Sequence, residues 1–393
     1  MSAEVIVVQA RDAAPEWWDA AVFLAGPTPR SPAVASWRPA AVEQLRAGWR
    51  TGRLVIFVPE DAGGGMHGTW HDQVAWEERN LHRADVIAFW VPRDLATLPG
   101  FTTNVEFGRW YGSGKAVLGA PPDAPGTRYL RHYADAPVDT LPDLVRVALD
   151  RLGDPARRTG AERDVPLHLW HRTEFRSWYD SQRAAGNELR AARAEWSTRP
   201  LFLWILAVEV WIRAEDRVKS NEVVLLRPDA VAVLLYRPGA TLAGTEIVLV
   251  REYRSATRTA DGYLWELPGG SGPGTPREQA IAEVAEETGL TLDPAHLRYH
   301  GSRQVAPTLS AHHTDLFSVE LTGAELDRHR TRGDVPYGRV EDSERTFVEV
   351  TTYGQILAGN AVDWPTLGQL AQVLGRTVLS GAGPTGNPAG PAQ

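Results

Sequence analysis

The 393-residue sequence contains no cysteine. Disulfide bonds, zinc sites built on thiolates and cysteine nucleophiles are therefore excluded. The sequence also lacks an apolar run long enough to span a bilayer, because its most apolar stretch, residues 201–212, is short and contains Glu209. The first residues lack the basic and apolar regions of a signal peptide. These absences predict a cytoplasmic protein without a membrane-spanning segment.

An excess of positive charge is missing as well. The formal net charge is -8, from 41 Lys and Arg against 49 Asp and Glu. A broad basic surface for a nucleic-acid polymer is therefore not expected. The apolar content of 43% and the charged content of 23% are ordinary for a globular protein. The length predicts two or three domains, and the composition favours an enzyme that acts on small molecules.

The stretch 265–290 has the pattern of a strand, a glycine loop, a helix and a glycine stop. Thr275 suits the N-cap position, and Pro276 suits the first helical turn because its missing N–H would have no partner there. Gly289 suits the left-handed residue that ends a helix. The pattern predicts a helix over residues 276–288.

Three carboxylates lie on one face of this predicted helix. Glu283, Glu286 and Glu287 follow the spacing i, i+3 and i+4, so their like charges repel one another. A hard divalent cation such as Mg²⁺ (or Mn²⁺) would remove this repulsion and could also bind substrate phosphates. The alternative interpretation is a solvated acidic face without a ligand.

The same residues resemble the Nudix box, the signature of the Nudix hydrolases. Residues 283–290 fit the second half of the box position by position, whereas Ala282 stands where the family has Arg and Gly274 where it has Glu. The resemblance implies that Glu283, Glu286, Glu287 and the backbone carbonyl of Gly269 bind the metal. It also implies catalytic roles for Glu286 and Glu287. The two departures predict a slow hydrolase, altered metal geometry, or a domain that binds a nucleotide without cutting it.

The segments EIVLVREYR (246–254) and WELPGG (265–270) are similar to the ADP-ribose and nucleotide-sugar pyrophosphatase branch of this family. The similarity implies an α+β Nudix fold over residues 201–380, with a mixed sheet sandwiched by helices, and a homodimer. It implies that Arg251 and Arg254 reach a ribose or phosphate; their alternative role is in surface salt bridges. The candidates for a catalytic base, in a later loop, are Glu341, Asp342 and Glu344.

The N-terminal third alternates short apolar strands with helical patterns. This alternation predicts an α/β domain with a parallel sheet and helices on both faces. Ligands of such sheets bind at the carboxyl ends of the strands. The loops after Ala25, Pro59, Pro92 and Ala120 are therefore expected to line one cleft.

Four ordered segments resemble the nucleoside 2-deoxyribosyltransferase family: FLAGP (23–27), WEE…L…ADVI (76–87), TNVEFG (103–108) and GKAV (114–117). The resemblance implies a flavodoxin- or Rossmann-like fold in which Glu106 attacks the anomeric carbon of a nucleoside. It also implies substrate-binding roles for Gly26, Arg30 and Glu77. Helix-dipole compensation is the alternative role for Glu106, and structural roles are the alternative for Arg30 and Glu77.

The expected organisation has four parts. Residues 1–155 form the deoxyribosyltransferase-like domain, 156–200 a linker with a bridging helix over 174–196, 201–380 the Nudix domain, and 381–393 a disordered tail. The predicted function is a nucleotide-processing hydrolase with an N-glycosidic and a pyrophosphate-cleaving site, whose partners are nucleosides or nucleotides. The alternatives are a nucleotide-binding sensor with an inactive Nudix site and, as a third interpretation, a purely structural role.

Overall fold

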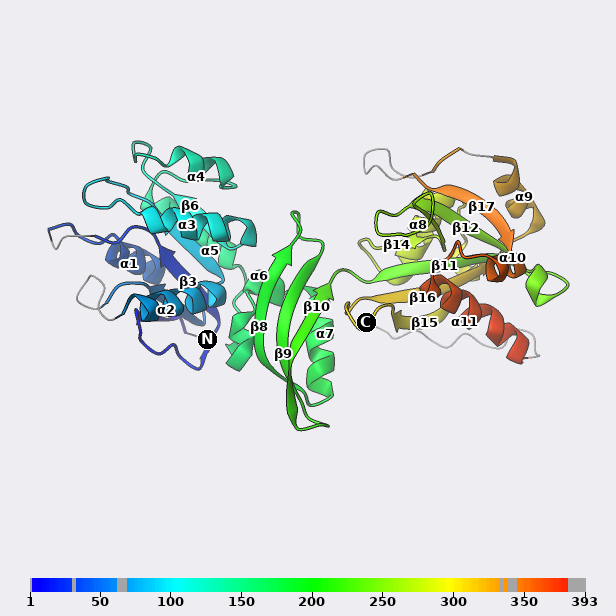
Figure 1. Cartoon of the computed structure of the whole chain (residues 1–393), viewed down its shortest axis with the longest axis horizontal. Coiled ribbons are helices and arrows are strands. Elements are labelled where there is room, and N and C mark those ends of the chain that lie inside the picture. The colour runs from blue at the N-terminus through cyan, green and yellow to red at the C-terminus, as the bar shows by residue number, and fades with distance from the viewer. Residues whose placement is uncertain (1, 30–32, 62–68, 333–334, 338–344, 381–393) are drawn as a thin grey trace. The chain divides into compact units, whose positions relative to one another are not determined.

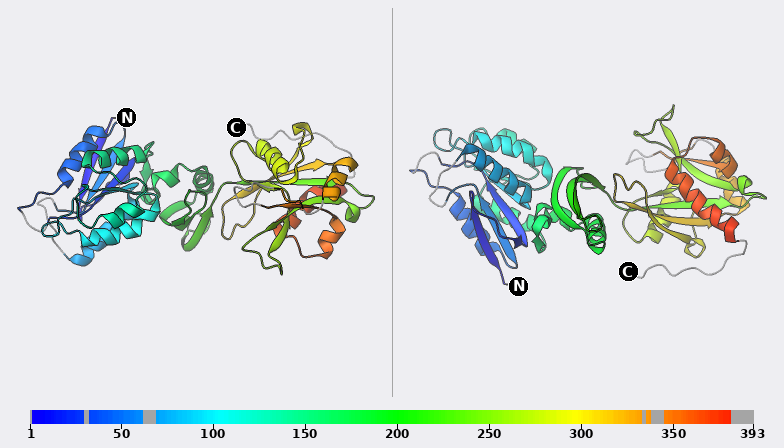
Figure 2. Two further views of the ribbon diagram at one scale, coloured as in Figure 1. Left: turned by 90° about the horizontal axis from the view of Figure 1, so that it is seen from above. Right: turned by 60° about the horizontal axis from the view of Figure 1, so that its bottom comes forward.

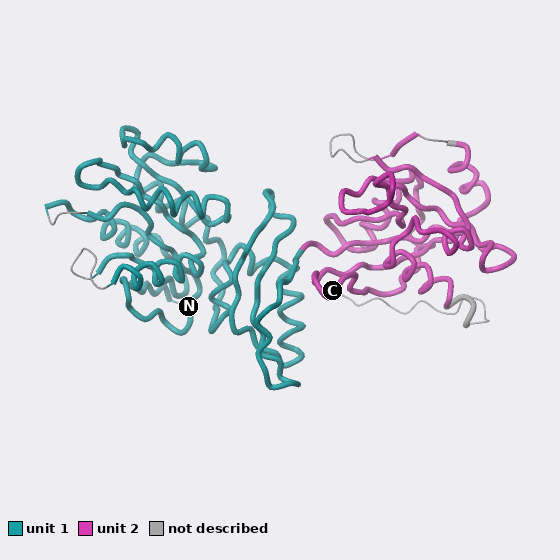
Figure 3. The backbone as a smooth tube through the Cα atoms, in the orientation of Figure 1, with its two compact units in different colours: residues 1–226 teal, residues 227–393 magenta. Residues whose placement is uncertain are grey.

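The computed structural model describes residues 2–29, 33–61, 69–332, 335–337 and 345–380. Arg30, the candidate bases Glu341, Asp342 and Glu344, and the tail 381–393 lie outside these residues. The chain divides into two compact units, residues 1–226 (unit 1) and 227–393 (unit 2), which Figure 3 colours separately. Among the described residues, none of the helices combines the length and apolar character needed to cross a bilayer.

Unit 1 begins with the predicted parallel sheet. Its five strands lie in the order β1-β4-β3-β5-β6, and all neighbours are parallel (Figure 1). The strands are β1 (Glu4–Gln9), β3 (Ala20–Ala25), β4 (Arg53–Val58), β5 (Val86–Trp90) and β6 (Ala116–Gly119). The helices are α1 (Arg38–Gly48), α2 (Trp70–Arg83), α3 (Phe101–Trp110), α4 (Arg128–Tyr133) and α5 (Leu141–Leu152), with a 3-10 turn η1 (Tyr111–Ser113).

Strand β3 shows why this sheet needs helices on both faces. All six of its residues are buried, and alternate side chains enter two different cores. One core contains Val22 with residues of α1 and α5, and the other contains Phe23 with residues of α2, α3 and α4. The predicted α/β architecture is therefore confirmed for this part of the chain.

The residues after 155 are tied into unit 1 by a buried ion pair, whereas the sequence predicts a linker there. Arg158 is fully buried and donates from Nη1 and Nη2 to the Asp85 carboxylate at 2.7 and 2.6 Å. The same carboxylate accepts the N–H groups of Ala21 and Leu167 at 2.7 and 2.8 Å. This segment contains β7 (Arg158–Thr159), which pairs with β2 (Trp17–Trp18), then η2 (Gly160–Asp164) and α6 (Leu167–Trp170).

The predicted bridging helix over 174–196 is wrong beyond residue 184. Helix α7 (Thr173–Ala184) ends before Gly186, whose φ of 76° is left-handed, and β8 (Glu188–Ser197) follows. Residues 188–197 favour a helix locally, but they pair along their length with β9 (Trp204–Ile212). Gly186 and Asn187 were the turn signal that the sequence analysis missed.

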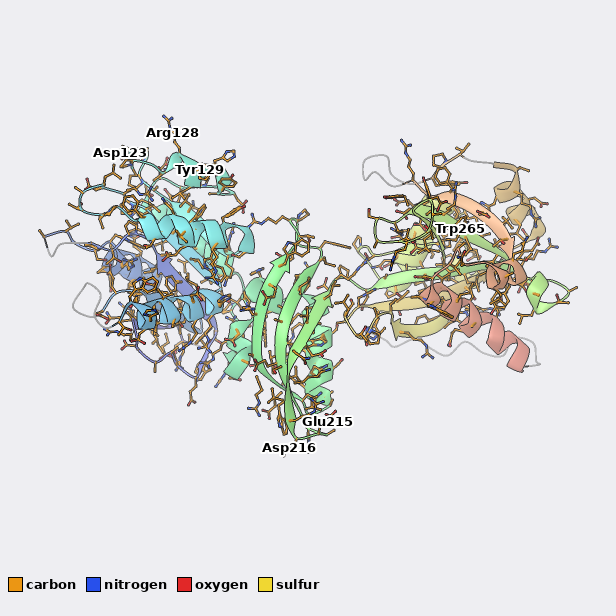
Figure 4. All side chains as sticks on the ribbon, in the orientation of Figure 1. Asp123, Arg128, Tyr129, Glu215, Asp216 and Trp265 are labelled. Atoms are coloured by element: carbon orange, nitrogen blue, oxygen red, sulfur yellow. The ribbon has the colours of Figure 1, made fainter. Side chains whose placement is uncertain are left out.

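Strands β8, β9 and β10 (Arg217–Leu226) form an antiparallel three-stranded sheet. Glu215 and Asp216, labelled in Figure 4, lie in the turn that joins β9 to β10. The sequence predicts strands over 201–226 but assigns them to the second domain. The contacts of the structure place them in unit 1, so the boundary between the compact units falls at residues 226 and 227 instead of 200 and 201.

Unit 2 is built on a mixed seven-stranded sheet with the path β13-β12-β11-β16-β15, in which β14 pairs with β11 and β17 with β12. The strands are β11 (Ala230–Arg237), β12 (Glu246–Tyr253), β13 (Tyr263–Glu266), β14 (Gly269–Gly270), β15 (Arg298–Gln304), β16 (His313–Glu320) and β17 (Phe347–Thr352). The helices are α8 (Pro276–Thr288), α9 (Gly323–Arg332), α10 (Tyr353–Ala358) and α11 (Trp364–Ser380), with 3-10 turns η3 (Leu242–Gly244) and η4 (Pro294–His296).

Helices cover both faces of this mixed sheet. Along β11, Val233 packs in one core with Val284 of α8, and Leu234 packs in the other with Leu370 of α11. Figure 2 shows α8 in yellow and α11 in red on the two sides of the strands. The expected mixed sheet between helices is present, while its assignment as a Nudix fold stays a prediction.

Candidate functional site

A cavity of about 510 Å³ opens at the carboxyl ends of the parallel strands in unit 1. Its walls include Gly26–Pro29 after β3, Pro59 after β4 and Pro99–Thr102 after β5, together with residues of α2 and α3. This size is typical of a small-molecule site. Three of the four predicted loops therefore meet at one cavity; its lining among the described residues does not extend to the loop after Ala120.

Two half-buried carboxylates, Glu77 of α2 and Glu106 of α3, line this cavity. Burial, with a smaller contribution from the charge of Glu77, raises the pKa of Glu106 to about 7, and the charge of Arg38 acts in the opposite direction. Burial also raises the pKa of Glu77, against the effects of a hydrogen bond from Gln73 and of Arg38. Gln73 Nε2 donates to Glu77 Oε1 at 2.8 Å. Glu106 therefore exchanges protons more readily near neutral pH than an ordinary carboxylate does, and the pKa of Glu77 is shifted in the same direction.

Arg38 is a further residue of this cavity that the sequence did not identify. Its side chain is 1% exposed and lines the cavity from α1. The guanidinium donates to the carbonyls of Gly26 at 2.7 Å and Leu24 at 3.0 Å, and it contacts Glu60 Oε1 at 2.5 Å. Arg38 therefore holds the turn after β3 and the end of β4 in one arrangement.

The sequence feature that could have identified Arg38 is its position: a charged residue stands on the face of a helix that is otherwise apolar and buried. The buried residues of α1 are Arg38, Ala41, Val42 and Leu45, which follow the spacing i, i+3, i+4 and i+7. A cation in the first position of such a stripe requires a buried anion or carbonyl partners. Glu60, which lies 22 residues away in sequence, could not be identified as that partner without the fold.

Gly26 forms the turn that accepts the Arg38 hydrogen bond. Its φ is 149°, and a Cβ there would lie 2.1 Å from the carbonyl oxygen of Trp90. A side chain at this position would therefore clash with β5, so the predicted binding residue Gly26 also has a structural reason to be glycine.

The predicted Nudix carboxylates lie on α8 of unit 2, next to strand β14. Glu287 is 7% exposed, and its Oε2 accepts the Gly269 N–H at 2.9 Å. Glu283 packs against Gly270, where an added Cβ would lie 2.6 Å from Glu283 Oε1. Burial raises the pKa of Glu287 well above its usual range; the Gly269 hydrogen bond opposes this shift, and the charges of Glu283 and Glu252 add to it.

The donor chemistry around Glu287 fits a hard cation only in part. Glu283 and Glu287 offer the carboxylate oxygens that Mg²⁺ prefers, and the raised pKa of Glu287 reflects burial and negative neighbours that a cation would compensate. However, within the residues that the structure describes, no three His, Cys, Asp or Glu side chains are arranged to hold a metal. Metal binding through Glu283, Glu286, Glu287 and Gly269 therefore stays a prediction.

The two predicted ligand-binding arginines, Arg251 of β12 and Arg254 directly after it, are engaged within the protein. Arg254 Nη2 forms ion pairs with Glu266 at 2.7 Å and Glu252 at 2.9 Å. The guanidinium carbon of Arg251 lies 4.7 Å from the ring centroid of Tyr263, a cation–π distance. The contact of Arg251 with Trp265 is longer, at 5.9 Å, and Trp265 is labelled in Figure 4. Their roles toward a ligand remain predictions.

The two departures from the Nudix box have different structural settings. Ala282 is exposed on α8, so a longer side chain fits there. Gly274 has a φ of 101°, where an L residue is strained, and an added Cβ would lie 3.1 Å from Glu278 Oε2. Arg254 already supplies positive charge near Glu287 from another part of the chain.

Residues 19–124 match the model of a family described as "Nucleoside 2-deoxyribosyltransferase like". This segment is therefore similar to that family, and it contains Gly26, Glu77 and Glu106. No curated protein matches the chain. A solved structure described as a crystal structure of ADP compounds hydrolase is 16% identical, with 50% of this chain and 96% of that chain covered and a TM-score of 0.34. A likeness at that level carries no argument here.

Proposed function

We propose that the N-terminal domain cleaves or transfers the N-glycosidic bond of a nucleoside or nucleotide. The observation that carries this proposal is the placement of Glu106 and Glu77 in one cavity at the carboxyl ends of the strands. Two carboxylates in different environments are the usual equipment for breaking a glycosidic bond. The family match over residues 19–124 supports the same chemistry.

In this mechanism the Glu106 carboxylate attacks the anomeric carbon. The C–N bond breaks, its electron pair leaves with the base, and the base takes a proton from Glu77. Water, or the N–H nitrogen of a second base, then attacks the anomeric carbon, the bond to Glu106 breaks with its electron pair returning to the carboxylate, and the proton of the attacking group passes to Glu77. Burial raises the pKa of both carboxylates, and the charge of Arg38 opposes this shift in both. The proposed roles require the form of the pair in which Glu106 is ionised and Glu77 carries the proton. Arg38 also positions the Gly26 turn that lines the cavity.

The proposal is tested by release of free base from a panel of nucleosides and nucleoside monophosphates. Glu106→Gln is expected to lower the rate about a thousandfold or more, the range seen when a nucleophile is lost. Glu43→Gln is the matched control, because Glu43 is an exposed carboxylate of α1 paired only with Arg46 at 2.5 Å among the described residues. Equal rates in wild type and Glu106→Gln would overturn the proposal.

A second candidate function belongs to unit 2: hydrolysis of the pyrophosphate of a nucleoside diphosphate derivative, such as ADP-ribose or a nucleotide sugar. The observation that favours it is the buried Glu287 carboxylate beside Glu283, at the end of the glycine loop. A bound Mg²⁺ would neutralise phosphate oxygens and activate water. Glu283 and Glu287 would hold this ion, with Glu286 assisting, and the Gly269 N–H orients the Glu287 carboxylate.

The sensor alternative is separated from hydrolysis by two measurements on the same protein. Mg²⁺-dependent release of nucleoside monophosphate that is lost in Glu287→Gln and kept in Asp327→Asn supports the hydrolase. Asp327 is an exposed acid of α9 and serves as the control. Nucleotide binding without release supports the sensor. The homodimer implied by the Nudix resemblance is part of this second proposal and is tested by sedimentation equilibrium.

A further inference from the structure

A second cavity, of about 610 Å³, lies within unit 1 between the end of α3, η1 and strand β8. Most of its lining comes from residues 164–169 and 193–199, beyond the segment that matches the deoxyribosyltransferase-like family. Arg109 and Trp110 line both this cavity and the one that holds Glu106. The second cavity is therefore a separate space that shares one wall with the candidate active site.

Basic side chains outnumber acidic ones around this second cavity. Its lining includes four cationic residues, Arg109, Lys115, Arg193 and Arg199, against the two acids Asp164 and Glu195. Both acids already have cationic partners: Asp164 pairs with Arg83 at 2.8 Å, and Glu195 with Arg193 at 2.5 Å. Arg109 and Arg199 pair with Glu78 and Asp135, neither of which lines the cavity.

Lys115 is the most buried of these cations, with 3% exposure. Its Nζ donates to the carbonyl oxygens of Leu81 at 2.6 Å and His82 at 2.9 Å, and it lies 4.4 Å from the Trp110 ring centroid. Among the described residues, these two hydrogen bonds use two of the three donors of a protonated lysine. Burial lowers the pKa of Lys115 to about 7, so an anion bound nearby would stabilise its charged form.

Two histidines add neutral hydrogen-bonding groups to the same lining. Burial lowers the pKa of both His82 and His168 to about 4, and the charge of Lys115 contributes to each shift. Both rings are therefore neutral at pH 7 and each offers one N–H donor. The buried Trp110 Nε1 also has no hydrogen-bond partner among the described residues.

We propose that this second cavity binds a small phosphate-bearing molecule. The basic excess compensates the charge of a phosphate group, and the imidazole and indole N–H groups together with Lys115 can donate to its oxygens. The volume exceeds the need of a single phosphate and suits a sugar phosphate or nucleotide. Since Arg109 and Trp110 form the shared wall, an occupant lies directly behind the Glu106 cavity.

The test is isothermal titration calorimetry of the full chain with two probes, inorganic phosphate and ribose 5-phosphate. Arg193→Gln is expected to weaken binding about tenfold, since hydrogen bonds to charged groups are the strong ones. Arg190→Gln is the matched control: it lies on the same strand, pairs with Glu188 at 2.8 Å and does not line this cavity. His168→Asn is a second variant, and thermal unfolding verifies that each variant is folded.

The outcomes separate the sources of the ligand. Equal affinity for both probes would show that the phosphate group alone is enough for binding. Tighter binding of ribose 5-phosphate would show that the cavity prefers a phosphate ester. Either outcome supports the proposed site. Absence of binding for both probes overturns the proposal. So does binding that Arg193→Gln and His168→Asn leave unchanged, because the probe then occupies another place, such as the Glu106 cavity. These results are independent of base release by Glu106.

Discussion

Glu106 in unit 1 and Glu287 in unit 2 are both carboxylates whose burial raises their pKa, but their surroundings differ. Beside Glu106, a fully buried arginine is locked onto Glu60 and two carbonyls, and the cavity in front is open. Beside Glu287, the charges of Glu283 and Glu252 accumulate, with the partly exposed Arg254 opposing them. In the first site, a buried arginine of the protein itself supplies positive charge next to the carboxylates. In the second site, the carboxylates carry negative charge that a bound cation would compensate.

The largest expected effect comes from removing the arginine that organises the first site. Arg38→Met leaves Glu60 buried without its partner and removes the donors to Gly26 and Leu24. Breaking a buried ion pair in this way costs about 3–5 kcal/mol of unfolding free energy. Chemical denaturation monitored by tryptophan fluorescence measures this loss.

The matched substitution in the second site is Arg254→Met. Its guanidinium is 44% exposed, so the loss of stability should be much smaller than for Arg38→Met. If both variants lost the same unfolding free energy, the two arginines would not differ as proposed, with Arg38 in a buried ion pair and Arg254 in ion pairs that solvent screens.

Metal-dependent stabilisation should distinguish the second site from the first. Mg²⁺ or Mn²⁺ at about 100 times its dissociation constant would stabilise unit 2 by about 2.7 kcal/mol. Glu287→Gln should abolish this shift of the thermal transition, whereas Glu106→Gln should leave it in place. If the metal-dependent shift of the thermal transition were still present in Glu287→Gln, the metal would bind somewhere other than the carboxylates of α8.

The stability of unit 2 should also depend on pH in a defined direction. Because the folded-state pKa of Glu287 is raised, the folded protein binds its proton more tightly than the unfolded chain does. The resulting stabilisation is fully present below the unfolded pKa and is lost as the pH rises through the folded pKa. Denaturation of wild type and Glu287→Gln across this window should show a smaller slope in Glu287→Gln, which lacks the contribution of Glu287.

Restoring the arginine of the Nudix pattern should have an intermediate effect. Ala282 is exposed, so Ala282→Arg can be accommodated and should raise Mg²⁺ affinity or turnover by about tenfold, the lower end of effects from residues that orient metal ligands. Gly274→Glu is a poor companion because of the left-handed φ of 101°. Unchanged affinity and turnover in Ala282→Arg would indicate that Arg254 already fulfils this role.

The pH dependence of base release tests Glu106 of the first site without any substitution. Only ionised Glu106 is a nucleophile, so kcat/KM should rise about tenfold per pH unit below the Glu106 pKa of about 7. At higher pH kcat/KM should fall again as Glu77 loses the proton that it donates to the leaving base. A profile that is flat between pH 5 and 8 would contradict the ionisation of Glu106 as the controlling step. Glu43→Gln should follow the wild-type profile.

The sequence was sufficient where local pattern and tertiary structure agree. The apolar strands of the parallel sheet and the capped helix 276–288 were predicted from alternation, caps and glycine stops, and α8 has these bounds in the structure. The sequence was insufficient where contacts between residues far apart in the chain determine the local structure. Residues 188–197 become a strand through pairing with β9, and Arg38 finds Glu60 only through the fold. The second cavity likewise joins segments that are far apart in sequence.

The central claim, that Glu106 is the nucleophile of an N-glycosidic reaction, is tested most directly by trapping its covalent intermediate. The protein is mixed with a nucleoside or nucleoside monophosphate that it cleaves, quenched in acid within the first turnover, digested and analysed by mass spectrometry. We predict a glycosyl adduct on the peptide that contains Glu106, with no adduct in Glu106→Gln. Base release without any adduct on that peptide, or an adduct on another residue, would contradict the account.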